Sequence, residues 1–179
     1  MIKSKIIKAL TFSSALLFSS FTMAELSDAP IDKRDNQAIA RQVINAPANK
    51  VWKEIGRVDG IENFVPEVFA STSVEGEGEG AIRTCVHHDG RKLVEQVVAF
   101  DEVSMTLTYT LVDGSELPMI NMYNTVQVHP INETQSLLVW EAKYDVTEEA
   151  ENPELVHQYM QGGLSVVSAG AKRYIEAAM

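Results

Sequence analysis

The sequence predicts an α+β domain in which a seven-stranded, curved antiparallel sheet wraps around one long C-terminal helix. The prediction rests on the order of the elements. One strand is followed by two short helical segments, then by six strands joined through short turns, and the last segment is a long amphipathic helix. Consecutive strands joined by tight turns form an antiparallel meander. One helix layer against one sheet is a stable way to bury both apolar faces.

The domain begins with a strand and two short helices. Residues 36–46 alternate in part between apolar and polar side chains, which is typical of a half-buried strand. Pro47 suits the first turn of a helix, and the apolar spacing extends that helix over residues 47–57. Residues 61–64 predict a second short helix.

From residue 68 to residue 146 the pattern is almost entirely that of strands. Asp89-Gly90 and Asp113-Gly114 are strong hairpin signals, and a glycine-rich turn at 75–80 separates the first two strands of this set. The six strands are predicted at 68–74, 81–88, 92–100, 105–112, 119–129 and 137–146, with a loop at 130–134 before the last.

The C-terminal helix carries the clearest signals. Asn152 is a good N-cap, and Pro153 and Glu154 are both favoured in the first helical turn. A helix from there to residue 178 would be roughly 40 Å long. Its apolar stripe consists of Leu155, Val156, Tyr159, Met160, Val166, Val167, Ala171, Tyr174 and Ile175.

Three glycines interrupt this helix, at positions 162, 163 and 170. Each costs roughly 1 kcal/mol relative to alanine in a helix interior. A missing side chain either leaves room for a ligand or allows close packing or a bend, and the sequence leaves these alternatives open.

The first 24 residues differ from the rest of the chain. Three lysines precede an apolar run of about 13 residues, and Thr22-Met23-Ala24 has small residues where a signal peptidase cuts. The run is shorter than the roughly 20 residues of a membrane-spanning helix, and an uncleaved anchor is the alternative. We expect a signal peptide at 1–24, a flexible arm at 25–35 and one domain at 36–179. The protein is then periplasmic or secreted, without stable membrane insertion.

The composition, with 45% hydrophobic and 22% charged residues, is that of an ordinary globular protein. The net charge is −10, and removal of residues 1–24, which hold three lysines and no acid, makes it −13. Nucleic-acid binding needs a clustered positive surface, so we expect neither nucleic acid nor anionic lipid as a partner. Cys85 is the only cysteine, which excludes an intrachain disulfide and favours a small buried side chain.

No pattern in the sequence predicts a metal or a cofactor. His87 and His88 are neighbours in a strand and would point to opposite faces, so they do not make a shared metal site. Gly78-x-Gly80 lies between two strands, whereas a dinucleotide-binding loop lies between a strand and a helix. The glutamates at 75, 77 and 79 fit a solvated hairpin tip.

Two glutamates, Glu95 and Glu141, stand inside otherwise apolar strands. An unpaired buried carboxylate is costly, so each must be paired, protonated or facing water. Each therefore lies either in an internal cavity or on the solvent face of the sheet, and the sequence leaves both open. Two carboxylates in one apolar pocket would be able to carry out general acid–base catalysis, which makes them the candidate catalytic residues.

Six short segments stand out by their order and spacing along the chain: Asn45-Ala46-Pro47-Ala48, Val51-Trp52, Gly78 to Arg83, Val94-Glu95-Gln96, Val139-Trp140-Glu141 and Lys172-Arg173-Tyr174. Together they resemble the START/Bet v 1-like (SRPBCC) superfamily, in its polyketide cyclase/dehydrase-like branch. The resemblance covers nearly all of residues 38–178. It implies the helix-grip fold, with a hydrophobic ligand cavity between the sheet and the C-terminal helix.

The chain is also similar to plant abscisic-acid-receptor-type helix-grip proteins. In those receptors an acid at each of the two matching strand positions faces the cavity, and a gating loop matches Asp89-Gly90. His87 or His88 then either lines the cavity mouth or lies on the surface at the end of the hairpin. The receptors' lysine that pairs with an acidic ligand aligns with Ala70, which argues against such a ligand here. The residues expected to bind ligand are Glu95, Tyr109, Leu111, Asn124, Glu141, Tyr159, Met160, Gly163 and Val166.

Three functions fit this interpretation, and no cofactor is expected for any of them. The first, which we prefer, is an exported binding protein that holds a small hydrophobic or amphipathic ligand. The second is a cyclase/dehydratase-type enzyme that uses Glu95 and Glu141. The third is a periplasmic accessory factor that acts through a protein partner, as one relative does for a methanol-oxidising system.

Overall fold

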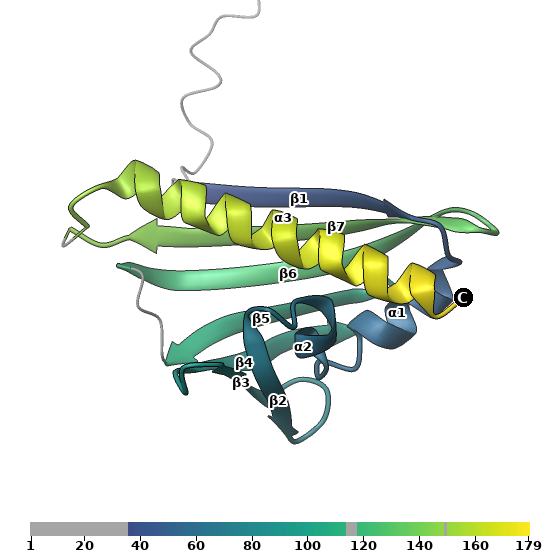
Figure 1. Ribbon diagram of the computed structural model, residues 1–179, viewed down its shortest axis with the longest axis horizontal. Coiled ribbons are helices and arrows are strands. Elements are labelled where there is room, and N and C mark those ends of the chain that lie inside the picture. Colours follow the sequence, from purple (N-terminus) through teal and green to yellow (C-terminus); the bar gives the residue numbers. More distant parts are fainter. Residues whose placement is uncertain (1–35, 114–117, 149) are drawn as a thin grey trace, which may run out of the picture. The chain divides into compact units, whose positions relative to one another are not determined.

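The computed structural model describes residues 36–113, 118–148 and 150–179. The signal peptide and the arm expected at 1–35 lie outside these residues. Figure 1 shows one sheet with a long helix lying across it. Along the chain the elements are β1 (Asn36–Ile44), α1 (Ala48–Ile55), α2 (Ile61–Phe64), β2 (Phe69–Glu75), β3 (Ile82–His87), β4 (Lys92–Asp101), β5 (Thr106–Asp113), β6 (Met119–Asn132), β7 (Gln135–Val146) and α3 (Pro153–Ala177).

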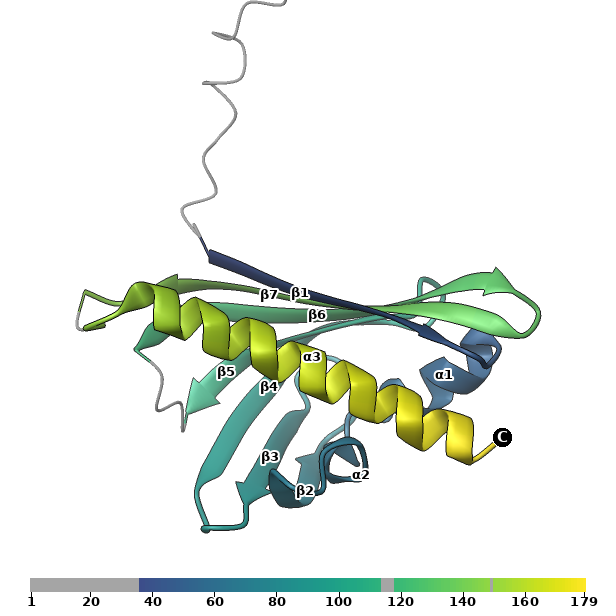
Figure 2. The ribbon, with the colours of Figure 1, turned by 45° about the horizontal axis from the view of Figure 1, so that its top comes forward.

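The seven strands of the described residues form one antiparallel sheet in the order β1-β7-β6-β5-β4-β3-β2. Strands β2 to β7 make the predicted meander, and β1 joins it by pairing with β7, from Asn36 opposite Tyr144 to Ile44 opposite Ser136. Register shifts in β4 and β6 mark bulges, which bend a strand and increase its twist. Figure 2 shows the curvature of the sheet: β2, β3 and β4 turn away from the plane of β1, β7 and β6. The predicted fold class is confirmed.

One predicted loop is wrong. Strand β6 continues through Pro130 to Asn132, which pairs with Gln135, so the turn before β7 is much shorter than the loop expected at 130–134. Proline lacks a backbone N–H and is tolerated in sheets at bulges, and a register shift lies between Pro130 and Asn132. The sequence rule that proline ends a strand fails here because the bulge accommodates it.

The core lies on the inner, concave face of the sheet. Its largest fully buried side chains include Tyr144, Ile44, Leu107 and Leu138. Helix α1 contributes Trp52, whose ring centroid lies 5.6 Å from that of Phe100 on β4. Burial of such side chains is worth about 1.5–3 kcal/mol each, so this layer supplies much of the stability without any disulfide.

Helix α3 covers the free edge of β1. The Gln161 side chain accepts a hydrogen bond from Ile39 N at 3.0 Å and donates one to Ile39 O at 2.8 Å, as a neighbouring strand would. An uncovered edge is a template for pairing with another chain. Gln161 therefore satisfies backbone groups that β1 would otherwise expose.

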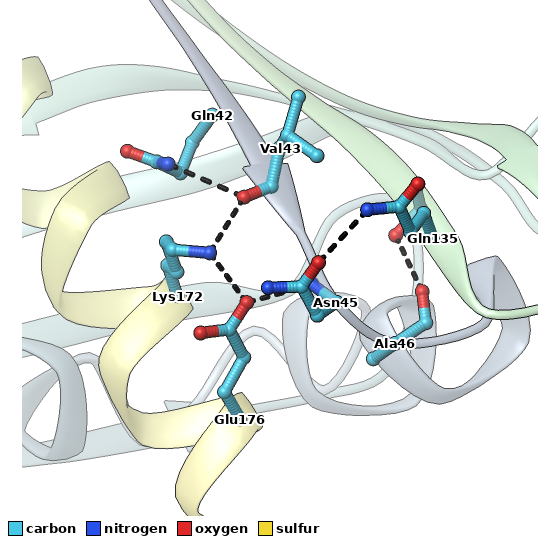
Figure 3. A network of polar contacts seen from close by, with 8 residues as sticks. Gln42, Val43, Asn45, Ala46, Gln135, Lys172 and Glu176 are labelled. Carbon is cyan, nitrogen blue, oxygen red and sulfur yellow. Dashed lines mark hydrogen bonds and ion pairs between the residues drawn. The ribbon is translucent and has the colours of Figure 1, made fainter.

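A polar network fixes the C-terminal end of α3 to the end of β1 (Figure 3). Lys172 Nζ donates to Val43 O at 2.9 Å and also contacts Glu176 Oε1. The same Glu176 oxygen accepts from Asn45 N at 2.7 Å, and Asn45 Oδ1 accepts from Gln135 Nε2 at 2.9 Å. These contacts link α3 to both β1 and the start of β7.

Gly170 marks a close contact between α3 and α2. A Cβ atom built at Gly170 would lie 2.0 Å from Phe64 O, which is far inside any normal contact distance. Arg173 Nη2 donates to the same carbonyl at 3.4 Å. Of the alternatives that the helical glycines left open, close packing holds for Gly170. No helix within the described ranges is long and apolar enough to cross a membrane.

Candidate ligand-binding cavity

A cavity of about 740 Å³ lies between the inner face of the sheet and the N-terminal half of α3. Its walls come from the segment after α2, from strands β2, β3, β4 and β6, from the β3–β4 turn and from α3. The lining residues are Val65, Val68, Phe69, His87, Arg91, Leu93, Glu95, Met119, Met122, Asn124, Gln158, Tyr159, Met160, Gly162, Gly163, Val166 and Val167. The lining is predominantly apolar, with a few polar groups, which is the usual make-up of a small-molecule site.

The wall formed by α3 presents apolar side chains that the rest of the described chain covers only in part. Tyr159 is 66% exposed and Val166 49% exposed. Between them, Cβ atoms built at Gly162 and Gly163 would meet nothing within 4 Å. At this pair of glycines the missing side chains leave open space, in contrast to Gly170.

At the inner end of the cavity Glu95 forms a buried ion pair with Arg83. The two residues face each other across β3 and β4, and Glu95 is only 3% exposed. Arg83 Nε donates to Glu95 Oε2 at 2.8 Å, and Nη2 lies 2.7 Å from the same oxygen without hydrogen-bond geometry. Arg83 Nη1 donates to Val58 O at 3.1 Å. Burial alone would lower the pKa of Arg83, but the Glu95 carboxylate acts together with Tyr109 and Cys85 in the opposite direction, and the pKa of Arg83 is raised.

Behind the ion pair lie two buried aromatic residues. The Arg83 guanidinium stands 4.3 Å from the centre of the Tyr109 ring, and Tyr109 Oη accepts a hydrogen bond from Trp140 Nε1 at 3.0 Å. Burial raises the pKa of Tyr109, so the phenol stays neutral. Tyr109 lines a separate internal space of about 10 Å³, enough for about one water molecule.

Asn124 on β6 is the second polar group at the inner end. It is 6% exposed and lines the cavity. Its Nδ2 contacts Met122 Sδ at 3.6 Å, whereas Oδ1 is buried and has no hydrogen-bond partner among the described residues. An unsatisfied buried acceptor costs roughly 1–3 kcal/mol.

The structure corrects the position expected for Glu141. Along β7 the buried residues alternate, with Trp140 and Ala142 inside and Glu141 outside. Its Oε1 accepts a hydrogen bond from Gln37 Nε2 at 2.6 Å and lies 3.3 Å from Lys143 Nζ. Glu141 is therefore on the outer face of the sheet and does not line the cavity.

The other expected residues divide in the same way. Asn124, Tyr159, Met160, Gly163 and Val166 all line the cavity, together with Glu95. Tyr109 and Leu111 do not: Tyr109 is part of the core behind the ion pair, and the half-buried Leu111 packs against that core. The pattern of β5 was sufficient to place both on the inner face but did not show what covers them.

The β3–β4 hairpin supplies the two histidines and the cysteine. His87 lines the cavity, with its ring 4.7 Å from that of Phe69, and His88 Nε2 lies 2.7 Å from Pro66 O. Within the described residues there is no group of three His, Cys, Asp or Glu side chains that would hold a metal ion. Cys85 is fully buried, as predicted, and burial raises the pKa of its thiol to about 12.

Sequence reasoning missed Arg83, the partner of Glu95. The hairpin at Asp89-Gly90 is the signal that could have found this pair. Once the register between β3 and β4 is known, Arg83 lies opposite Glu95. The loop holds three residues, with Gly90 at φ 87° and His87 N bonded to Arg91 O. A two-residue loop would have shifted the pairing of β3 with β4 by one residue, and the sequence is compatible with both loop lengths.

The fold and the cavity define a class of protein, in which a curved sheet grips a long C-terminal helix and a ligand-sized space separates the two. The chain belongs to the family described as polyketide cyclase / dehydrase and lipid transport, whose model matches residues 37–176.

Solved structures share this fold. Norcoclaurine synthase from Thalictrum flavum, in complex with dopamine and hydroxybenzaldehyde, matches with a TM-score of 0.66 and 15% identity, over 99% of this chain and 99% of that chain. The protein XoxI from Bacillus cereus has a TM-score of 0.65 and 19% identity, over 80% of this chain and 94% of its own. A protein from Thermobifida fusca has a TM-score of 0.62 and 26% identity, over 77% of this chain and 92% of its own. A search of curated proteins found no match.

Proposed function

We propose that this chain is an exported binding protein that holds a small hydrophobic or amphipathic molecule in the cavity beneath α3. The observation that carries the proposal is the apolar wall of α3, where Tyr159 and Val166 face a space of about 740 Å³ instead of packing on the sheet. When a ligand covers this open apolar surface, the burial favours binding by about 25 cal/mol per Å².

The comparisons support the same proposal. The family description includes lipid transport. The norcoclaurine synthase structure, which shares the fold, holds dopamine and hydroxybenzaldehyde, two small aromatic molecules. These findings bear on the class of ligand and leave its identity to experiment.

The enzyme alternative loses its main support. A cyclase or dehydratase that used Glu95 and Glu141 together would need both carboxylates in one cavity, and the two lie on opposite faces of the sheet. Glu95 is in addition paired with Arg83, which holds it as a hydrogen-bonded carboxylate. Binding therefore explains the site better than acid–base catalysis by this pair.

Native mass spectrometry of the protein purified from its own cells tests the proposal directly. We expect a copurified small molecule on the wild-type protein and at least a tenfold lower occupancy on Gly163→Leu, because the new side chain enters the cavity. Ala169→Leu is the matched control, since Ala169 is exposed on the same helix and does not line the cavity. Ligand-free wild-type protein that instead retains a partner protein in a pull-down would favour the accessory-factor hypothesis.

Export is a separate part of the proposal and rests on the pattern of residues 1–24. N-terminal sequencing of the protein recovered from the periplasm or medium should begin at Glu25. A chain that keeps Met1 would contradict export by cleavage and would leave the cavity proposal unaffected.

A further inference from the structure

We infer that the cavity selects ligands whose buried polar group is a hydrogen-bond donor, such as a phenol, an alcohol or an ammonium group, over ligands that bury a carboxylate or an ether there. The inference rests on the proposed binding function and adds the chemistry of the ligand's inner end. It is based on the two polar side chains at the inner end of the cavity, Glu95 and Asn124.

Glu95 presents an acceptor. Within the described residues, the hydrogen bonds and the ion pair of Glu95 all use Oε2: Arg83 approaches it through Nε and Nη2, and the Cys85 thiol lies 3.9 Å away. Oε1 is the oxygen that these contacts leave for the cavity. An ionised carboxylate accepts hydrogen bonds and donates none.

Asn124 carries a second acceptor. Its Nδ2 is turned toward Met122 Sδ, and its Oδ1 is buried without a partner in a residue that is 94% buried and lines the cavity. Oδ1 is closed off from the cavity in the structure, and a rotation of the Asn124 side chain would bring it to a ligand donor. An ether or a carboxylate placed there would leave two acceptors facing each other. Buried donors and acceptors that stay unmatched lower affinity more than matched ones raise it.

The inner end offers no accessible cation for an acidic ligand. Arg83 does not line the cavity, and its Nη2 is fully buried behind Glu95. Among the described lining residues the basic side chains are His87 and Arg91, on the β3–β4 hairpin. Arg91 is four residues from Glu95, about 13 Å along a strand. An acidic group therefore lacks a counter-charge at the inner end of the cavity.

Three naphthalene derivatives of similar size test the inference by isothermal titration calorimetry. 2-Naphthol carries a donor, 2-methoxynaphthalene carries only an acceptor, and 2-naphthoate carries a negative charge. We expect wild-type protein to bind 2-naphthol about tenfold more tightly than 2-methoxynaphthalene, which is the effect of about one matched hydrogen bond. 2-Naphthoate should bind no more tightly than the ether.

Asn124→Leu removes one acceptor and should reduce the preference for 2-naphthol at least threefold. This variant should fold, because a buried unpaired polar group is replaced by an apolar one beside open space, and its melting temperature should equal or exceed that of the wild type. Thr125→Val is the control: the residue is next along β6 and bonds to Thr108 on the outer face. The control should keep the wild-type preference.

Three results would overturn the inference in distinguishable ways. Equal binding of all three compounds, abolished in Gly163→Leu, would show that the cavity binds ligands without reading a donor. If none of the three compounds bound, the result would count against the inference and the proposed function together. Tightest binding of 2-naphthoate in the wild type and in Asn124→Leu would also reject the inference.

Discussion

Replacement of Gly170 by alanine tests the contact between α3 and α2. A Cβ atom there would lie 2.0 Å from Phe64 O, roughly 1.5 Å short of an ordinary van der Waals contact. Overpacking of this kind typically costs about 1–3 kcal/mol, and displacement of the carbonyl would also weaken its hydrogen bond from Arg173, which is worth about 0.5–1.5 kcal/mol. Alanine regains about 1 kcal/mol of helix propensity. We expect Gly170→Ala to lower the free energy of unfolding by about 2 kcal/mol.

Gly163→Ala is the matched control for this substitution. It makes the same change on the same helix, but its Cβ would meet nothing within 4 Å. Only the propensity effect remains, so this variant should be stabilised by up to about 1 kcal/mol. Urea unfolding followed by circular dichroism should then separate the two variants by about 3 kcal/mol. At a typical m value of about 2 kcal/mol per M this is about 1.5 M in the midpoint. A Gly170→Ala variant as stable as Gly163→Ala would refute the close contact.

Two further predictions concern buried polar groups. Glu95→Gln should lower the free energy of unfolding in urea by about 3–5 kcal/mol, because it leaves the buried Arg83 guanidinium without its counter-charge. Glu141→Gln on the outer face should stay within about 0.5 kcal/mol of the wild type. Equal effects of the two substitutions would contradict the burial of the ion pair. Cys85 should not react with Ellman's reagent at pH 8 until urea unfolds the protein. Burial raises the pKa of Cys85 to about 12, so between about pH 9 and pH 12 the folded protein keeps a thiol proton that the unfolded chain loses. The stabilisation from this thiol is complete below pH 9 and is lost as the pH rises to 12, at up to about 1.4 kcal/mol per pH unit. Rapid labelling of the folded protein would contradict this.

The course of the chain was predictable because its turns carry strong local signals. Gly90 adopts the positive φ that the turn requires, and the Asn152 side chain accepts a hydrogen bond from Leu155 N at the start of α3. Pro130 misled the prediction because a bulge, which depends on the partner strand, removes the usual conflict between proline and a sheet.

The site was predictable only in part, and the two glutamates show why. Glu95 and Glu141 each interrupt an apolar strand, so their local sequences are alike. One lies inside because Arg83 pairs with it, and the other lies outside beside Lys143. Which face a strand residue occupies depends on register, and a shift of one residue reverses it. The decisive information is in the partner strand and was not available from either strand alone.

The pairing of β1 with β7 has a consequence for how the protein is made. Gln37 bonds to Glu141, Ile39 to Gln161 and Asn45 to Glu176, so the first strand is held by residues 104, 122 and 131 positions later. During synthesis β1 has no partner until nearly the whole chain has emerged, and contacts of such long range form slowly. Strands β2 to β7 can pair as they emerge, but the edge of β1 that α3 covers stays open until the last residues are made. Such an edge is a template for pairing with another chain, so α3 also protects the newly made protein from aggregation.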